Sequence, residues 1–118
     1  MKLEIGQYVR TDEGRIGKVL TEEYEYKDSY SQQIEFKEGI EETWYMDFNE
    51  EIVKVSHNLI DLIEVGDYVN GGQVREKTKD YIRISGGNFI FEYLENEKDI
   101  KSIVTKEQFE SMSYKVGE

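Results

Sequence analysis

The residue types that most often perform catalysis are sparse in this chain. Cysteine is absent, which excludes thiol catalysis, disulfides and thiolate metal sites. His57 is the single histidine, and it lies between Ser56 and Asn58 in a polar stretch. A serine adjacent in sequence to its histidine does not have the geometry of a catalytic triad. We therefore predict that His57 is a turn or capping residue and that the protein is not an enzyme.

Two groups of carboxylates are close enough in sequence to be considered as metal ligands. They are Asp47, Glu50 and Glu51, and Glu92, Glu95, Glu97 and Asp99. Neither group follows the calcium-loop pattern, which has a central glycine and a terminal glutamate. Solvated turns have the same composition, so the sequence predicts neither a metal site nor a cofactor.

A stripe of acidic residues interleaved with aromatic ones is the leading candidate for a binding surface. Its acidic members are Glu22, Glu23, Glu25, Asp28, Glu35, Glu38, Glu41, Glu42, Asp47, Glu50 and Glu51, and its aromatic members are Tyr24, Tyr26, Tyr30, Trp44 and Tyr45. Carboxylates spaced along strands can imitate a phosphate backbone, and aromatic side chains supply anchors that charge alone lacks. We expect the contact residues to be Glu22, Glu23, Glu25, Tyr24, Tyr26, Glu41, Glu42, Trp44 and Tyr45. The alternative is a solvated acidic face with no partner.

A second candidate surface is the only locally basic stretch, residues 75–83, which has four basic and two acidic residues. Side chains alternate along a strand. On a regular hairpin, Arg75, Lys77 and Lys79 would therefore share a face, and Tyr81 and Arg83 would continue it. That face fits an anion such as a nucleotide, with an aromatic ring for stacking. The competing interpretation is a charged strand edge that prevents aggregation.

The overall charge limits the partners of both surfaces. The 26 acidic residues outnumber the 15 basic ones, giving a net charge of −11. Residues 1–61 have 15 acidic and 7 basic residues, or −8, whereas residues 62–118 have 11 and 8, or −3. Such a chain repels phosphate backbones, so we predict no direct binding of nucleic acid. Basic protein surfaces are attracted instead.

Composition indicates a small folded protein. The chain has 118 residues, of which 37% are hydrophobic, with nine tyrosines and five phenylalanines. No apolar run approaches 18 residues, and charged sequence follows Met1 directly, so we expect neither a membrane span nor a signal peptide. Together with the lack of cysteine, these features predict a cytoplasmic protein with no membrane partner.

The two halves of the chain begin with similar sequences, which form a repeat. Ile5-Gly6-Gln7-Tyr8-Val9 returns sixty residues later as Val65-Gly66-Asp67-Tyr68-Val69. A turn signal follows each copy, Asp12-Glu13-Gly14 in the first and Asn70-Gly71 in the second. A β-branched strand then follows in each half. The pattern predicts a duplicated small β-module, with Tyr8 and Tyr68 in equivalent places.

Other segments are assigned by their periodicity. Alternation predicts strands at residues 15–20, 23–26, 33–36, 42–46, 72–76, 81–84, 89–94 and 100–104, and an edge strand at 114–116. Turns are expected at 27–30 and 37–39. Thr105 and Gln108 form a capping box that predicts one short helix, from about Lys106 to Ser111. Residues 48–63 have helical spacing but β-branched content, and we favour a strand, a turn at 56–60 and a second strand over a helix.

The predicted fold class is mostly β: two tandem SH3-like small β-barrel modules with one short C-terminal helix. The first, acidic module would span residues 1–61, and the second would span residues 62–118. Halves of this size bury little surface alone. We therefore expect them to share a core and to unfold as one cooperative unit. The oligomeric state stays open, and a homodimer is one option.

Gly6-Gln7-Tyr8-Val9, the glycine turn at Gly14 and Gly17-Lys18-Val19 together resemble the opening of small SH3-like barrels of the KOW and Tudor type. Residues 8–18, 58–71 and 100–110 are also similar to a family of small proteins from phages and prophages of clostridia and related bacteria. This second resemblance covers both ends and the middle of the chain, but not residues 22–51 or 73–99. It carries over no catalytic residues.

The resemblance implies a phage-encoded accessory protein in the cytoplasm of a bacterial host. Combined with the acidic charge, it leads us to expect an anti-defence inhibitor, such as an anti-CRISPR, that binds a basic host protein as a nucleic-acid mimic. One alternative is an oligomeric sponge that sequesters a nucleotide immune signal through the basic hairpin. Another is a phage structural or assembly component.

Overall fold

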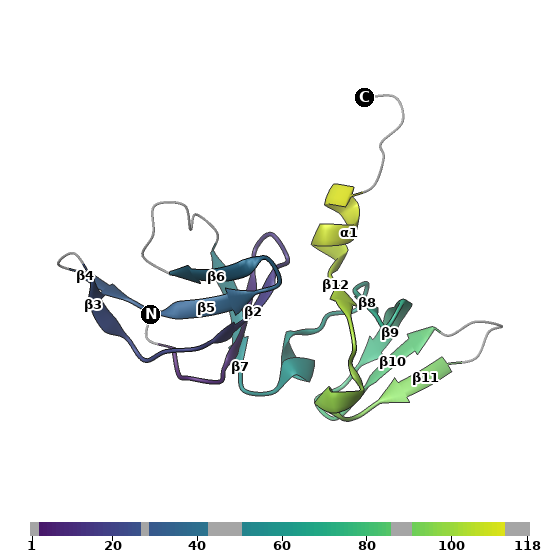
Figure 1. The fold of residues 1–118 in the computed structure, drawn as a ribbon. Coiled ribbons are helices and arrows are strands. Elements are labelled where there is room, and N and C mark those ends of the chain that lie inside the picture. The colour runs from purple at the N-terminus through teal and green to yellow at the C-terminus, as the bar shows by residue number, and fades with distance from the viewer. Residues whose placement is uncertain (1–2, 27–28, 43–50, 86–90, 113–118) are drawn as a thin grey trace, which may run out of the picture. The chain divides into compact units, whose positions relative to one another are not determined.

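The computed structural model describes residues 3–26, 29–42, 51–85 and 91–112. The chain divides into two compact units, Met1–Asn58 and Leu59–Glu118, which we call the first and the second unit (Figure 1). The sequence had placed this boundary between Asp61 and Leu62. Each unit is built around its own antiparallel sheet.

The first unit contains a five-stranded sheet in the order β6-β5-β2-β1-β7 and a separate two-stranded sheet of β3 and β4. The strands are β1 Tyr8–Thr11, β2 Ile16–Val19, β3 Tyr24–Tyr26, β4 Ser29–Ser31, β5 Gln33–Phe36, β6 Gly39–Glu42 and β7 Ile52–Ser56. Every described pairing is antiparallel.

The second unit contains a five-stranded sheet in the order β11-β10-β9-β8-β12. Its elements are the 3₁₀ helix η1 Leu59–Leu62, the strands β8 Tyr68–Val69, β9 Gly72–Lys77, β10 Ile82–Ser85 and β11 Phe91–Leu94, the 3₁₀ helix η3 Glu97–Asp99, the strand β12 Ile103–Val104 and the helix α1 Lys106–Met112. Thr105 and Gln108 form the predicted capping box, with bonds of 3.1 and 3.3 Å between the side chain of each and the backbone N–H of the other.

The two sheets have the same topology. Reading each sheet from its first strand, β1 corresponds to β8, β2 to β9, β5 to β10, β6 to β11 and β7 to β12. The predicted mostly-β class with one short C-terminal helix is confirmed. Neither sheet closes on itself among the described residues, so the SH3-like barrel stays a prediction.

The repeat extends to the turn that precedes the first strand of each sheet. Gly6 and Gly66 both adopt a positive φ, +86° and +101°, which only glycine adopts at little cost. The Gly6 N–H donates to the Val19 carbonyl at 2.9 Å, and the Gly66 N–H donates to the Val74 carbonyl at 3.0 Å. The predicted equivalence of these segments is confirmed by these bonds.

One side chain closes this turn in each unit. In the first, the Glu4 N–H donates to Gln7 Oε1 at 2.8 Å, and in the second the Glu64 N–H donates to Asp67 Oδ2 at 2.8 Å. Asp67 is fully buried, and its other oxygen accepts from the Lys106 N–H at 2.9 Å. The second turn is therefore also fastened to the start of α1.

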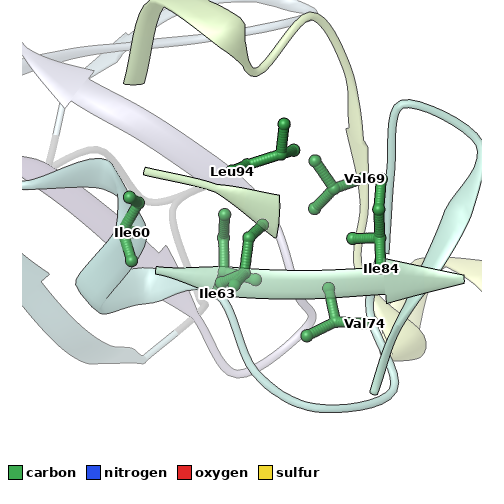
Figure 2. Close-up of a cluster of buried hydrophobic side chains, with 7 residues drawn as sticks. Ile60, Ile63, Val69, Val74, Ile84 and Leu94 are labelled. Carbon is green, nitrogen blue, oxygen red and sulfur yellow. The ribbon is translucent and has the colours of Figure 1, made fainter. Parts of the chain in front are cut away.

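Each unit has its own cluster of buried apolar side chains. The first comprises Leu3, Val9, Val19, Ile34 and Phe36. The second comprises Ile60, Ile63, Val69, Val74, Ile82, Ile84 and Leu94 (Figure 2). Among the described residues these clusters have no member in common, and the shared core stays a prediction. Cooperative unfolding of the two halves stays a prediction.

In two segments the structure differs from the sequence-based prediction. Ser29 and Tyr30, expected in a turn, belong to strand β4 and pair with β3. The second strand expected within residues 48–63 is replaced by the 3₁₀ helix Leu59–Leu62, whereas the first is present as β7. The 3₁₀ turn buries Leu59, Ile60 and Leu62 at once, which an alternating strand cannot do. The edge strand predicted at 114–116 lies outside the described residues, as do residues 43–46 of the strand predicted at 42–46.

Asn70 fastens the β8–β9 turn to the segment before β12. Its Oδ1 accepts from the N–H groups of Lys101 and Ser102 at 2.7 and 3.1 Å, and its Nδ2 donates to the Asp99 carbonyl at 2.8 Å. Its φ is +52°, in the left-handed region. We expect Asn70→Ala to lower the free energy of unfolding by about 2 kcal/mol in urea denaturation, because it loses these bonds and strains the turn.

Asn70→Gly is the matched control, since glycine relieves the strain but not the lost bonds. It should cost about half as much as the alanine variant. Equal losses in the two variants would show that backbone strain contributes nothing at this turn.

Candidate functional site

The units differ where the second and third strands of each repeat are joined. In the second unit, β9 and β10 are joined by a short turn in which Thr78 Oγ1 accepts from the N–H groups of Asp80 and Tyr81 at 3.2 and 3.1 Å. In the first unit, the β3–β4 hairpin is inserted between β2 and β5 (Figure 1). Because the second sheet forms without such an element, the hairpin is not required by the repeated topology.

The exposed surface of the β3–β4 hairpin is acidic and aromatic. Glu25 pairs with Tyr30 across the two strands, so both side chains lie on one face. Tyr30 is 64% exposed, and Glu22, Glu23 and Glu25 are all exposed. Tyr24 is half-buried, and its hydroxyl is shielded and has no hydrogen-bond partner among the described residues. Among the described residues, the hairpin and the two residues before it thus present Glu22, Glu23, Glu25 and Tyr30 to solvent.

Buried hydrogen bonds fix the base of the hairpin. Gln32 is 2% exposed; its Nε2 donates to the carbonyls of Leu3 and Thr21 at 2.7 and 3.2 Å, and its Oε1 accepts from the Leu3 N–H at 2.8 Å. The Gln33 N–H donates to Thr21 Oγ1 at 2.9 Å. The element that carries the exposed carboxylates is therefore attached to the core through satisfied polar groups.

One predicted contact residue is already paired within the first unit, and others lie outside the described residues. Glu41 forms an ion pair with Arg15, whose guanidinium lies 4.0 Å from the centre of the Phe36 ring. A partner would compete with Arg15 for this carboxylate, and the role of Glu41 in binding stays a prediction. The side chains of Tyr26 and Glu42, and all of Trp44 and Tyr45, lie outside the described part.

The predicted basic face of residues 75–83 is broken by a β-bulge. Glu76 pairs with Arg83 and Val74 pairs with Ile84, so Arg75 is the extra residue and the alternation is interrupted. Lys77 pairs with the buried Ile82, and its ammonium donates to the Asp61 carbonyl at 2.8 Å. Lys77 therefore does not join a common basic face.

Arg75 and Lys79 are exposed, whereas Tyr81 and Arg83 are half-buried. The Tyr81 hydroxyl donates to Glu76 Oε1 at 2.8 Å. This hydrogen bond to a carboxylate is the main cause that raises the pKa of Tyr81. The register of the β9–β10 hairpin places Arg83 opposite Glu76, a neighbour that alternation from Arg75 did not predict.

The outer side of the second sheet also has two aromatic residues that sequence reasoning assigned only to a strand. The Arg83 guanidinium lies 4.3 Å from the centre of the Phe91 ring, and the rings of Tyr81 and Tyr93 meet edge-on at 5.4 Å. Phe91 and Tyr93 are 49% and 58% exposed. Their spacing of two residues on one strand was the signal that could have identified them.

The remaining candidate residues are His57 with its neighbours and the carboxylates considered as metal ligands. His57 Nε2 lies 2.7 Å from Glu4 Oε2, and both side chains are exposed. Ser56 Oγ accepts from the Asn58 N–H at 3.0 Å, as in the predicted turn. No group of three potential metal ligands occurs among the described residues.

No family model matches this chain, and neither does any curated protein or any solved structure. Within the described ranges, no helix is long and apolar enough to span a membrane.

Proposed function

We propose that the protein is a non-enzymatic binding protein that contacts a basic surface of another protein through the β3–β4 hairpin of its first unit. The observation that carries this proposal is the inserted hairpin itself. It is an element that the second copy of the same topology lacks, it exposes Tyr30 opposite Glu25, and the exposed Glu22 and Glu23 directly precede it. An element that the scaffold does not need is free to serve recognition.

The chemistry of the hairpin fits a partner rich in lysine and arginine. The exposed carboxylates of Glu22, Glu23 and Glu25 steer such a partner, within a protein whose net charge is −11. The Tyr30 ring offers area for packing and a face for a cation. Partner surfaces with this chemistry include those that normally hold nucleic acid. In the phage context that the resemblance implies, the partner would be a host defence protein and the hairpin a nucleic-acid mimic.

The proposal is tested by competition. The immobilised protein is incubated with a bacterial lysate at low salt, and the captured proteins are then challenged with short duplex DNA. We expect at least one captured protein to be released by the DNA, and also by about 0.5 M salt, at which exposed charges are screened within a few ångströms. Failure of duplex DNA to displace any captured protein would contradict the nucleic-acid-mimic interpretation.

Tyr30 is expected to be the main anchor of this contact. Exposed tyrosines near the centre of an interface often cost at least 2 kcal/mol of binding free energy when truncated. Tyr30→Ala should therefore weaken partner binding by about tenfold or more, measured by calorimetry with the captured protein. It should change the unfolding free energy by less than about 0.5 kcal/mol.

Ile40→Ala provides the matched control, since Ile40 is 56% exposed but lies on β6, outside the hairpin. Its affinity for the partner should equal that of the wild type. If both substitutions weaken binding alike, the contact surface is not centred on the hairpin.

A further inference from the structure

A second surface lies on the outer side of the second unit's sheet, on and next to β10 and β11. It consists of Tyr81, Arg83, Phe91 and Tyr93, which we call the aromatic–arginine cluster. Arg83 and Tyr93 are directly opposite each other in the β10–β11 pair, so they lie on the same side of the sheet. Phe91 follows two residues before Tyr93 on the same strand and shares that side.

The guanidinium of Arg83 is positioned by a ring rather than by a carboxylate. It lies 4.3 Å from the centre of Phe91 and has no hydrogen-bond partner among the described residues. Stacking holds the guanidinium plane and leaves its N–H edges available, and those edges match the oxygens of a phosphate. The cluster therefore combines a positioned hydrogen-bond donor for an anion, Arg83, with a neighbouring exposed ring, Tyr93.

Such a pair suits a ligand that has a flat aromatic group and an anionic group a short distance apart. We propose that the aromatic–arginine cluster binds a free nucleotide, with its base stacked on Tyr93 and a phosphate on Arg83. This surface and this ligand class are independent of the hairpin and of the protein partner proposed above. Base stacking on an aromatic side chain tolerates any base, so little base selectivity is expected.

The charges favour a small nucleotide over a nucleic-acid strand. Glu76 lies opposite Arg83 across β9 and β10, and the protein as a whole has a net charge of −11. Each additional phosphate of a strand would meet this repulsion, whereas a monophosphate has one anchor and few charges.

The geometry also favours the face of β11 over its edge as the site of binding. β11 is the last strand of its sheet. Glu92 pairs with the buried Ile84 and so lies on the core side of the sheet, yet it is exposed. A charge at an inward position of an edge strand opposes the addition of another strand. A second copy of the chain or an extended peptide is therefore a poor occupant of this edge.

The proposal is tested on the whole protein by two-dimensional NMR of backbone amides, titrated with AMP to about 10 mM, a range that detects weak binding. We expect saturable shifts at Arg83, Phe91 and Tyr93. Adenosine alone and ribose 5-phosphate alone should each bind at least about fivefold more weakly, because each lacks one of the two groups. No shifts at these amides, or equal binding of ribose 5-phosphate, would overturn the proposal.

Two substitutions separate the stacking and the anion contacts. Tyr93→Ala, at a residue 58% exposed, should weaken AMP binding about tenfold. Arg83→Lys keeps the charge but loses the planar fork, and should also weaken it severalfold. Tyr30→Ala, an exposed tyrosine of the other unit, should leave AMP binding unchanged.

Two further results would identify another occupant and reject the nucleotide. A six-nucleotide single strand that binds more tightly per nucleotide than AMP would indicate a strand. Concentration-dependent shifts of the cluster without AMP, together with a dimer mass in sedimentation equilibrium, would indicate a second copy of the chain.

Discussion

Replacing Glu22, Glu23 and Glu25 together by lysine should reduce partner capture to background. These carboxylates are exposed on or beside β3, and the triple change moves the net charge by +6, from −11 toward −5. Reversal removes the attraction to a basic surface and creates repulsion at the contact itself, which slows association and weakens affinity. Because exposed substitutions rarely alter stability by more than about 0.5 kcal/mol each, thermal unfolding should change little.

A triple variant with the same charge change provides the control. Glu13, Glu38 and Glu51 are exposed in the same unit but outside the hairpin. Their replacement by lysine should lower the association rate modestly, through the summed field, and keep most of the affinity. Equal losses in the two triple variants, measured by surface plasmon resonance, would show that net charge and not the hairpin determines binding.

Glu41 and Glu42, which the sequence also predicts as contact residues, are kept unchanged in this variant. Glu41 is paired with Arg15. A lysine at position 41 would place two cations together and leave Arg15 without this carboxylate, so any loss of binding could come from local destabilisation. Confining the change to the hairpin removes that ambiguity.

The largest loss of stability is expected for Asp67→Ala. Asp67 is fully buried, and its two oxygens accept from the backbone N–H groups of Glu64 and Lys106 at 2.8 and 2.9 Å. Alanine would leave both donors without these bonds and would release the turn from the start of α1. We expect the free energy of unfolding to fall by about 3 kcal/mol, measured by urea denaturation.

Gln7→Ala is the corresponding change in the first unit. Gln7 closes the equivalent turn with a single bond to the Glu4 N–H and is half-buried, so its loss should cost only about 1 kcal/mol. Asp67→Asn keeps one acceptor oxygen and should fall between the two alanine variants. If Asp67→Ala lowers the free energy of unfolding no more than Gln7→Ala does, the hydrogen bond from the Lys106 N–H to Asp67 contributes nothing to stability.

The contribution of the ion pair between Lys106 and Glu64 to stability depends on pH. Lys106 Nζ lies 2.8 Å from Glu64 Oε1, and its hydrogen bond to that carboxylate is the main cause that raises the pKa of Lys106. The folded-state pKa lies above the unfolded one, so the stabilisation is present below the unfolded pKa and is lost as pH rises through the folded pKa. The Lys106 side chain is about half exposed, which keeps this contribution small.

Features that depend on neighbouring residues were determined by the sequence itself. The repeat of Gly6-Gln7-Tyr8-Val9 as Gly66-Asp67-Tyr68-Val69 predicted two equivalent turns and strands, because a positive φ at glycine and a following β-branched strand are local properties. The helix after Thr105 was predictable for the same reason, since a capping box is completed within one turn.

Features that depend on contacts distant in sequence were decided only by the tertiary structure. The bulge at Arg75 arises from the pairing between β9 and β10. The register of the same pair places Lys77 opposite Ile82 and Glu76 opposite Arg83, so Lys77 and Arg83 lie on different faces despite their matching parity. Arg15 reaches Glu41 through the order of strands in the first sheet. Alternation along one strand contains no information about which strand will be its neighbour or whether the register shifts. The sequence therefore identified the charged and aromatic residues, and strand pairing decided which of them face solvent together.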